Sequence, residues 1–237
     1  TLTSAEINKL RCLIQRRSQH EPMAYILECC EFYGIDFYID HHTLIPRPET
    51  ELLAEEAIKF ASHHFLSGRQ LTIADIGTGS GAIAVSLALA LPQAIIYATD
   101  ISASALQVAS INCRRHNVNG RVTVIQGNLL EPIPEPVDLI VANLPYIRNC
   151  DLKTLSQEII NFEPMKALAG GEDGLDKIRC LLAGIPGKIR PRGCLLLEIG
   201  QGQATAVSSV IDSYFPQAAI ELIPDRSGID RAGKVIF

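Results

Sequence analysis

The chain has 237 residues, of which 47% are hydrophobic and 20% are charged, and its formal net charge is −5. This composition is typical of a globular protein with one large domain and an appendage, and the negative charge argues against non-specific nucleic-acid binding as the main role. No apolar run reaches the roughly 18 residues that a bilayer-spanning helix needs, and the N-terminus does not resemble a signal peptide, so we expect no membrane segment. The seven cysteines lack a C-x-x-C spacing, which favours reduced thiols in the cytoplasm.

The N-terminal part of the chain differs in pattern from the rest. Residues 5–17 place apolar side chains at helical spacing, whereas residues 23–40 alternate as the strands of a hairpin do. Residues 41–66 carry a proline-containing turn into a helix, for which Thr50 is the predicted N-cap. We therefore predict that residues 1–45 form a small helical and hairpin domain.

The remaining residues, 46–237, alternate between short apolar runs and longer helix-like stretches. Strands are predicted at 71–76, 94–100, 122–126, 137–143, 194–200, 218–223 and 234–237. Helices are predicted between them at 82–91, 102–116, 174–189 and 203–215. This alternation predicts an α/β fold with a Rossmann-like, seven-stranded and mostly parallel sheet, in which the last two strands form an antiparallel pair.

A glycine-rich loop follows the first of these strands. The strand runs into Asp75, and glycines then alternate at positions 77, 79 and 81 before a helix begins. Glycines let the backbone approach a ligand closely, and the helix N-terminus presents free N–H groups. The G-x-G-x-G spacing differs from the G-x-G-x-x-G of dinucleotide binders, which argues against a nicotinamide dehydrogenase. On this loop alone, a nucleotide-like ligand and a simple tight turn are equal alternatives.

Polar residues also end the next two strands. Asp100 is placed where an acid can accept both hydroxyls of a ribose, although it can also cap the following helix. Asn128 and Leu129 follow the next strand and are predicted to flank an adenine, with a solvent-facing turn as the alternative. Together with the glycine loop, Asp100 predicts a ligand that contains adenosine.

The fourth strand ends in VANLPYI, residues 141–147. The side-chain oxygen of Asn143 and the backbone carbonyl of Leu144 are two acceptors that can take both hydrogens of a planar –NH2 group. Pro145 bends the chain away from the sheet because it cannot donate to the ladder. Tyr146 offers a flat face to a planar substrate. This arrangement favours methylation of a weakly basic nitrogen.

These motifs carry a resemblance to a known family. The stretch IADIGTGSGAIAV, the Asp100 position and NLPY resemble class I S-adenosylmethionine-dependent methyltransferases. LIPRPETELL (44–53), EPMAYILECCEFYG (21–34) and FEPMKALAGGEDGLD (162–176) resemble the HemK-type protein-(glutamine-N5) methyltransferases, and this resemblance runs through nearly the whole chain. It implies methyl transfer from S-adenosylmethionine to the glutamine of the Gly-Gly-Gln motif in peptide chain release factors, with S-adenosylhomocysteine as the product.

The resemblance also implies which residues form the site. The cofactor site is implied to be lined by Asp75, Ile76, Gly77, Thr78, Gly79, Asp100, Asn128, Leu129 and Asn143. The substrate glutamine is implied to be held by Asn143, Leu144, Pro145 and Tyr146, which are also the candidate catalytic residues. Arg47 and Thr50 are implied to lie over the methionine end of the cofactor or to shape the entrance.

The sequence departs from the family at several positions. Leu144 stands where the family usually has proline, and NLPY also resembles ribosomal RNA adenine dimethyltransferases. Glu28 replaces a usual glycine, and Asn128 stands where an acid is common. The family's N-terminal helical domain is longer, so we expect residues 1–45 to be part of a substrate-recognition domain whose first portion is missing.

The sequence also allows alternatives to the methylation of a release-factor glutamine. Adenine-N6 methylation of RNA or DNA is the nearest alternative, and a catalytically silent methyltransferase-like binding module is another. The pairs His41-His42 and His63-His64 lack the spacing of metal ligands, and neighbouring side chains are expected to point apart, so we predict no metal site. We expect a monomer whose partner is a release factor and which has no direct role in binding nucleic acid.

Overall fold

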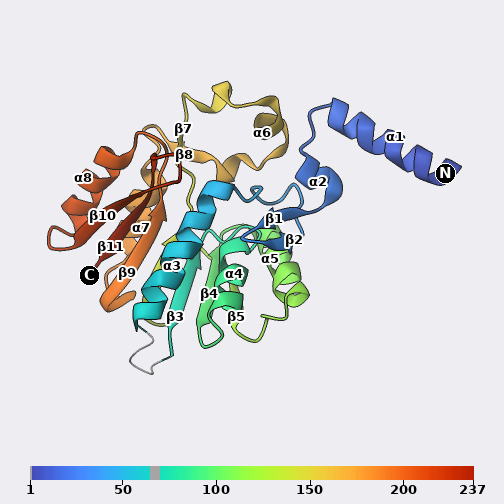
Figure 1. Ribbon diagram of the computed structural model, residues 1–237. Coiled ribbons are helices and arrows are strands. Elements are labelled where there is room, and N and C mark those ends of the chain that lie inside the picture. The colour runs from blue at the N-terminus through green and yellow to red at the C-terminus, as the bar shows by residue number, and fades with distance from the viewer. Residues whose placement is uncertain (1, 65–69) are drawn as a thin grey trace.

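A seven-stranded sheet runs through the centre of the computed structural model, which describes residues 2–64 and 70–237 (Figure 1). The strands are, in spatial order, β10 (Ala219–Pro224), β11 (Asp230–Ile236), β9 (Ile189–Glu198), β6 (Val137–Ala142), β3 (Thr72–Ile76), β4 (Ile95–Asp100) and β5 (Val122–Gln126). The five strands from β9 to β5 are parallel, and β11 pairs antiparallel with both β9 and β10. The predicted α/β fold with a mostly parallel sheet and a closing antiparallel pair is confirmed.

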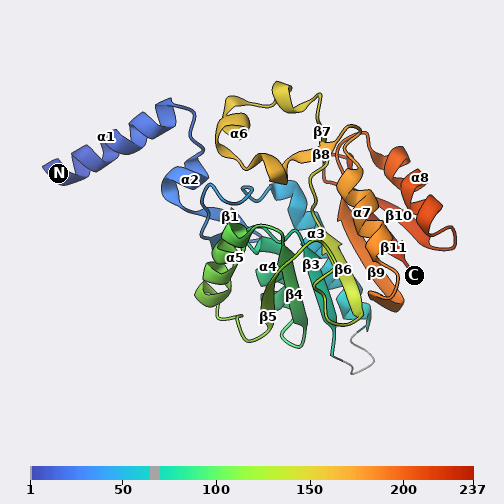
Figure 2. The same ribbon diagram turned by 180° about the vertical axis from the view of Figure 1, so that it is seen from behind.

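Helices cover both faces of this sheet (Figures 1 and 2). One face carries α3 (Glu51–His64), α4 (Ala82–Ala90) and α5 (Ala103–Arg115), and the other carries α7 (Asp176–Gly184) and α8 (Ala204–Tyr214). Strands β3 and β6 are buried along their whole length, as their unbroken apolar sequences predict. Alternate residues face opposite sides, so Ile73 packs in the core beneath α3 and α4, whereas Ala74 packs in the core beneath α7 and α8.

The N-terminal part contains two helices and a hairpin. Its elements are α1 (Ser4–Ser18), α2 (Met23–Leu27), β1 (Cys30–Phe32), β2 (Ile35–Phe37) and the 3-10 helix η1 (Pro48–Thr50). Helix α1 extends away from the rest of the molecule and buries none of its residues (Figures 1 and 2). In contrast, Phe32, Phe37 and Ile39 are buried in the core beneath α3 and α4, so the hairpin packs onto the larger unit. The boundary at residue 45 stays a prediction.

The hairpin is shorter than the predicted range of residues 23–40. Its first part forms helix α2, because the carbonyl of Pro22 accepts two amides of the first turn and Glu28 ends the helix with a φ of 53°. The chain then reverses at Tyr33 and Gly34, whose φ values of 54° and 71° suit a two-residue hairpin loop.

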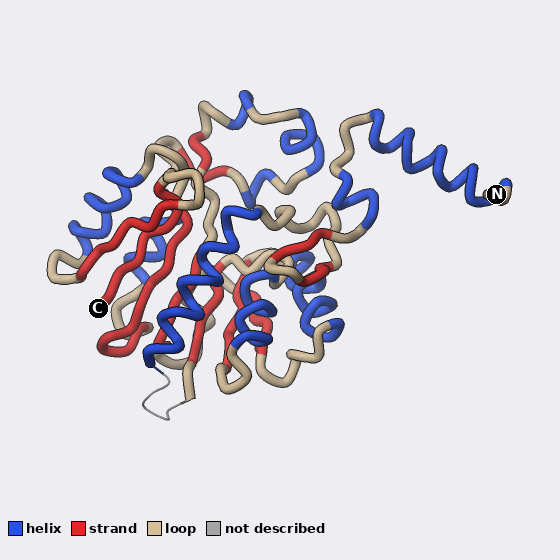
Figure 3. Tube along the Cα trace, in the orientation of Figure 1, coloured by secondary structure: helices blue, strands red, loops and turns tan. Residues whose placement is uncertain are grey.

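A long connection leads from β6 to α7, which precedes β9 (Figure 3). Its elements are β7 (Ile147–Arg148), the 3-10 helix η3 (Leu152–Thr154), α6 (Gln157–Phe162), the 3-10 helix η4 (Met165–Ala167) and β8 (Ala169–Gly171). Strands β7 and β8 pair in parallel and close the ends of this connection. We call residues 147–171 the covering segment, because they arch over the edge of the sheet where β6 ends (Figures 1 and 2).

Helix α7 is also shorter than predicted and ends at Gly184 instead of residue 189. Ile185 still has helical backbone angles, but Pro186 has no backbone N–H to continue the helix, and Gly187 adopts a φ of 76°. Strand β9 correspondingly begins earlier than expected, at Ile189. Within the described part of the chain, no helix has both the length and the apolar character needed to cross a membrane.

Candidate active site

Four parallel strands end at one edge of the sheet. In the register of β3, Ile76 lies opposite Thr99 of β4 and Ala142 of β6. Ala142 in turn lies opposite Leu197 of β9. The strands therefore bring together the polar or glycine residues that end or follow them, which are Gly77, Asp100, Asn143 and Glu198. The carboxyl edge of such a sheet is the usual place for a ligand crevice.

A cavity of about 320 Å³ opens at this edge. Its lining contains most of the residues predicted for the site, namely Arg47, Thr50, Gly77, Thr78, Gly79, Asp100, Asn128, Leu129, Asn143, Leu144 and Pro145. The predicted cofactor residues Asp75 and Ile76 do not line it and lie buried in the sheet behind the loop. Sequence reasoning missed other walls of the cavity, including Phe32, Ile83 and Met165.

Asp75 holds the glycine loop in shape. Its Oδ2 accepts from the Thr78 hydroxyl at 2.6 Å and from the backbone N–H of Ala84 at 3.1 Å, which ties the loop to helix α4. Burial raises the pKa of this carboxyl to about 6. Gly77 adopts a φ of 73°, and an added Cβ there would lie 3.2 Å from a methyl of Leu144. The loop therefore needs glycine at this position both for its backbone and for its packing.

Asp100 offers both carboxylate oxygens to the backbone at the rim of the cavity. Oδ2 accepts from the N–H of Gly79 and Oδ1 from the N–H of Ser102, each at 2.9 Å. The N-cap of helix α5 is Ser102, whose hydroxyl accepts from Ala105, so Asp100 is not the capping residue. Each oxygen of Asp100 keeps a further lone pair, and the residue lines the cavity.

Asn128 and Leu129 lie in the cavity wall beyond β5. The Asn128 amide donates to Glu131 at 2.8 Å, and the Leu129 carbonyl accepts from the Thr99 hydroxyl at 3.1 Å. Leu129 adopts a φ of 49°, which is uncommon for a residue with a branched side chain. These contacts fix the turn that sequence reasoning placed beside the adenine.

Asn143 belongs to a row of hydrogen-bonded polar side chains. Its Nδ2 donates to the Thr50 hydroxyl at 3.0 Å, and that hydroxyl donates to Glu198 Oε2 at 2.6 Å. The Tyr146 hydroxyl donates to the other oxygen of Glu198 at 3.2 Å. Thr50 directly precedes the first residue of helix α3, and the described hydrogen bonds of its hydroxyl go to Asn143 and Glu198, so its role as the N-cap stays a prediction.

Glu198 is the functional-site candidate that sequence reasoning missed. Its side chain is buried at the end of β9, and burial raises its pKa above the ordinary value. Burial likewise raises the pKa of the Tyr146 hydroxyl. The only signal in the sequence is an acid at the end of the apolar run CLLLE, which resembles the Asp100 position and could have been given the same weight.

A second cavity of about 200 Å³ adjoins the first. Asn143, Leu144 and Pro145 line both cavities, whereas Tyr146 and Glu198 line the second. Four residues of the covering segment also line this second cavity, namely Ile147, Ile159, Ala167 and Leu168. The two spaces therefore meet at the residues predicted to hold the substrate.

An ion pair connects the covering segment to the N-terminal turn. Arg47 donates to Glu163 at 2.5 Å, and the Glu163 side chain is only 1% exposed, whereas that of Arg47 is 32% exposed. The other oxygen of Glu163 accepts from the backbone N–H of Ile45 at 3.4 Å. Because Arg47 lines both cavities, this pair fixes a wall that they share.

Comparison with known proteins decides the family. The model of the methyltransferase small domain matches residues 52–172. The release factor glutamine methyltransferase of Geobacter sulfurreducens is 42% identical over 97% of this chain and 78% of its own length. That of Moorella thermoacetica is also 42% identical, over 92% of this chain and 76% of its length. The chain belongs to the release factor glutamine methyltransferase family.

Other similarities concern a longer relative and the fold. The bifunctional methyltransferase of Rickettsia prowazekii is 38% identical over 90% of this chain, which corresponds to 44% of the relative. The catalytic domain of hMettl16, solved with a MAT2A 3'UTR hairpin, has a TM-score of 0.69 and 14% identity, covering 92% of this chain and 82% of that one. A methyltransferase from Pyrococcus furiosus has a TM-score of 0.58 and 17% identity, covering 97% of both chains. At these identities the two structures show the shared methyltransferase fold alone.

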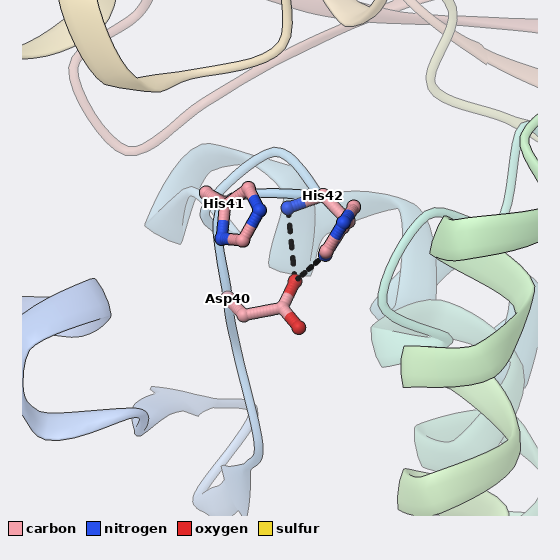
Figure 4. A group of neighbouring side chains, drawn as sticks. All are labelled: Asp40, His41 and His42. Atoms are coloured by element: carbon pink, nitrogen blue, oxygen red, sulfur yellow. Dashed lines mark hydrogen bonds and ion pairs between the residues drawn. The ribbon is translucent and has the colours of Figure 1, made fainter.

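His41 and His42 lie differently from what their spacing in the sequence predicted. Asp40, His41 and His42 bring one ligand atom each within 4.8 Å of one another, a grouping that could hold a metal ion (Figure 4). The rings of His41 and His42 lie 3.9 Å apart between centroids, so the expectation that neighbouring histidines point apart is wrong for this pair. Asp40 Oδ1 already accepts from the backbone of His42 and lies 3.0 Å from its Nδ1. The side chains of His63 and His64 lie outside the described residues.

Proposed function

We propose that this chain transfers a methyl group from S-adenosylmethionine to the side-chain amide nitrogen of the glutamine in the Gly-Gly-Gln motif of a peptide chain release factor. The observation that carries this proposal is the position of Asn143, Leu144 and Pro145, which line both the larger and the smaller cavity. The methyl donor in the larger cavity and the glutamine that accepts the methyl group in the smaller cavity would meet at these residues. The names of the relatives and the stretches that resemble them support the release factor as substrate.

The larger cavity fits S-adenosylmethionine. Its volume of about 320 Å³ falls in the range of small-molecule sites, which is about 300–1,000 Å³. Asp100 would accept the ribose hydroxyls, and a Cβ added at Gly79 would meet no atom closer than 4.0 Å, so the loop leaves open space there. When bound, the cofactor supplies an electrophilic methyl group on a sulfonium. Asn128 and Leu129 would flank its adenine.

The smaller cavity would hold the glutamine side chain. The Asn143 oxygen and the Leu144 carbonyl would accept the two hydrogens of its –NH2 group and direct the nitrogen toward the methyl group. Such acceptors draw electron density to a nitrogen whose lone pair is shared with its carbonyl, and their effect is largest in the transition state. Tyr146 and Ile159 would enclose the rest of the side chain. As the nitrogen–carbon bond forms, the sulfur–methyl bond would break to leave S-adenosylhomocysteine, and one proton would pass from the nitrogen to solvent.

We propose that the enzyme acts as a monomer in the cytoplasm. Residues of a single chain line both cavities, so the site needs no second copy. The seven cysteines are unpaired thiols, which suits a reducing compartment.

Labelled S-adenosylmethionine, incubated with the enzyme and a release factor, tests this function directly. Mass mapping should place the methyl group on the glutamine of the Gly-Gly-Gln motif, and bulk RNA offered in the same reaction should stay unlabelled. Labelled adenine in the RNA would instead support the adenine-N6 alternative. Binding of S-adenosylmethionine without any transfer would support a silent binding module.

The variant Asn143→Ala tests the residue at the junction of the two cavities. We expect kcat to fall about 10²- to 10³-fold, as for the loss of one preorganised polar group, with a smaller change in cofactor affinity. Wild-type turnover in this variant would mean that NLPY is only a turn and that the substrate nitrogen is held elsewhere.

A further inference from the structure

The hydrogen bonds among the polar side chains at the carboxyl edge of the sheet all point toward Glu198, which is their final acceptor. Asn143 donates to Thr50, Thr50 donates to Glu198, and Tyr146 donates to the second oxygen of the same carboxylate. Thr50 is 4% exposed and Glu198 is 3% exposed, so bulk water does not compete at the centre of the row. The orientation of each group therefore depends on its neighbour.

The carboxylate of Glu198 sets this direction. An ionised carboxylate only accepts hydrogen bonds, whereas a threonine hydroxyl has one proton to donate and two lone pairs. Because the single proton of Thr50 goes to Glu198 at 2.6 Å, the hydroxyl oxygen can only accept from its other neighbour. Asn143 must then turn its –NH2 group toward Thr50, and its carboxamide oxygen points the opposite way.

The orientation of this carboxamide matters for the reaction. The Asn143 oxygen has no hydrogen-bond partner among the described residues, and the residue lines both cavities. A carboxamide turned by half a rotation would present its own –NH2 group to the substrate –NH2, so that neither could accept. We propose that Glu198 is a positioning residue, which acts through Thr50 to hold the Asn143 oxygen toward the substrate amide. This inference rests on the proposed function.

The rate should consequently depend on the protonation of Glu198. The titratable and charged groups that face it are Tyr146, Arg231 of β11 and Glu49 of η1. Burial raises the pKa of Glu198, while the hydroxyl donors Thr50 and Tyr146 and the charge of Arg231 oppose that rise. A protonated Glu198 can donate to Thr50, which frees the hydroxyl proton and removes the constraint on the carboxamide. The rate should therefore fall as the pH is lowered, through a pKa above that of an exposed glutamate.

Two variants of Thr50 test the relay. Thr50→Val keeps the shape of the side chain but removes the hydroxyl, and kcat on a release factor should fall about 10- to 100-fold, as when a positioning partner is lost. The dissociation constant of S-adenosylmethionine should change little. Thr50→Ser keeps the hydroxyl and should recover most of the rate. Thr72→Val is the matched control, since Thr72 is also buried but lies at the opposite end of β3, and it should leave kcat unchanged.

The pH profile of Glu198→Gln is an independent measurement. Glutamine keeps the size of the side chain but can present either its oxygen or its –NH2 group to Thr50, so it no longer fixes the direction of the Thr50 proton and kcat should be lower. Because glutamine does not titrate, the decline toward acid pH should disappear. If circular dichroism shows that Thr50→Val does not fold, the pH profile of Glu198→Gln alone tests the role of Glu198. The role of Glu198 is wrong if Thr50→Val turns over as fast as Thr72→Val, if Thr50→Ser is as slow as Thr50→Val, or if the acid decline persists in Glu198→Gln.

The wild-type enzyme separates this inference from the function on which it rests. No methylation of the release factor by the wild type would overturn the proposed function, and the role of Glu198 would fall with it. An active wild type with unaffected Thr50 and Glu198 variants would overturn the role of Glu198 alone.

Discussion

Asp100 shows how one side chain can serve both the loop and a ligand. Its two oxygens each accept one backbone N–H, from Gly79 and from Ser102. A carboxylate has about four acceptor positions, so two remain for the hydroxyls of a ribose. The sequence left two roles open for Asp100, the cap of the following helix and the acceptor of ribose hydroxyls. Because Ser102 caps helix α5, the role as ribose acceptor is the one that remains as a proposal.

The variant Asp100→Ala should weaken S-adenosylmethionine binding by about 1.5–3 kcal/mol, the usual scale for hydrogen bonds to a charged group. Isothermal titration of the folded variant measures this. Asn128→Ala is a useful control, because the Asn128 amide is engaged with Glu131 and its loss should weaken binding less. Unchanged affinity in Asp100→Ala would assign the carboxylate to the backbone contacts alone.

Asp75 makes the stability of the fold depend on pH. Its folded pKa of about 6 lies above the ordinary value of 3.8. Between these values the unfolded chain releases a proton that the folded chain keeps, so stability should decrease as the pH rises from about 4 to about 6 and then level off. A difference of about two pH units corresponds to roughly 3 kcal/mol.

Urea denaturation of the wild type and of Asp75→Asn at several pH values isolates this effect. The amide keeps one oxygen for Thr78 and Ala84 but does not titrate, and it replaces Oδ1, which has no partner among the described residues. The wild type should lose stability relative to the variant between about pH 4 and pH 6. If the free energy of unfolding depends on pH in the same way for both proteins, Asp75 is not the group responsible for the pH dependence.

At the scale of elements, much of the fold follows from local pattern. Five unbroken apolar runs predicted the five parallel strands, because a strand buried on both faces needs apolar residues at every position, as in β3 and β6. The glycines and Asp100 were found because they end strands of a parallel sheet, where ligands bind. Helix α2 was missed because its five residues are too few to show a helical period against an alternating background.

The partners of the site residues could not be predicted in the same way. Thr50 and Glu198 are 148 positions apart in the sequence and meet only because η1 and the end of β9 lie at the same edge. Similarly, residues 162–171 of the covering segment belong to a stretch that resembles the family, but nothing local indicates that Ile159 and Leu168 line the second cavity. Contacts between residues so far apart depend on how the helices and strands assemble. Hydrophobic periodicity and composition carry no information about that assembly.

Two substitutions of Leu144, which follows β6, test the proposed acceptor role of its backbone carbonyl. No hydrogen bond from its backbone amide is found among the described residues, and only its carbonyl is proposed to act, so Leu144→Pro should keep most of the activity. Its side chain is buried in the core beneath α7 and α8, so Leu144→Ala should reduce stability by about 2–5 kcal/mol while leaving the carbonyl in place. Steady-state kinetics and urea denaturation measure the two effects. An inactive proline variant beside an active alanine variant would contradict the backbone-acceptor role.

At the scale of the whole molecule, two ion pairs fasten the covering segment to the N-terminal part. Arg17 of α1 pairs with Glu158 of α6 at 2.5 Å, and both side chains are about two fifths exposed, at 42% and 38%. Arg47 pairs with Glu163, which is almost completely buried. The first pair is screened by water and contributes little, whereas the second joins the parts of the chain that enclose both cavities.

The two pairs should therefore respond differently to substitution. Arg47→Ala leaves the Glu163 carboxylate buried without its cation, and removal of one partner from a buried pair typically reduces stability by about 3–5 kcal/mol. Glu163→Gln leaves an arginine that is about a third exposed and can be hydrated, so its effect should be smaller. Arg17→Ala is the control in the exposed pair and should change the free energy of unfolding by less than about 1 kcal/mol. Equal effects of Arg47→Ala and Arg17→Ala in urea denaturation would mean that the buried pair does not hold the covering segment in place.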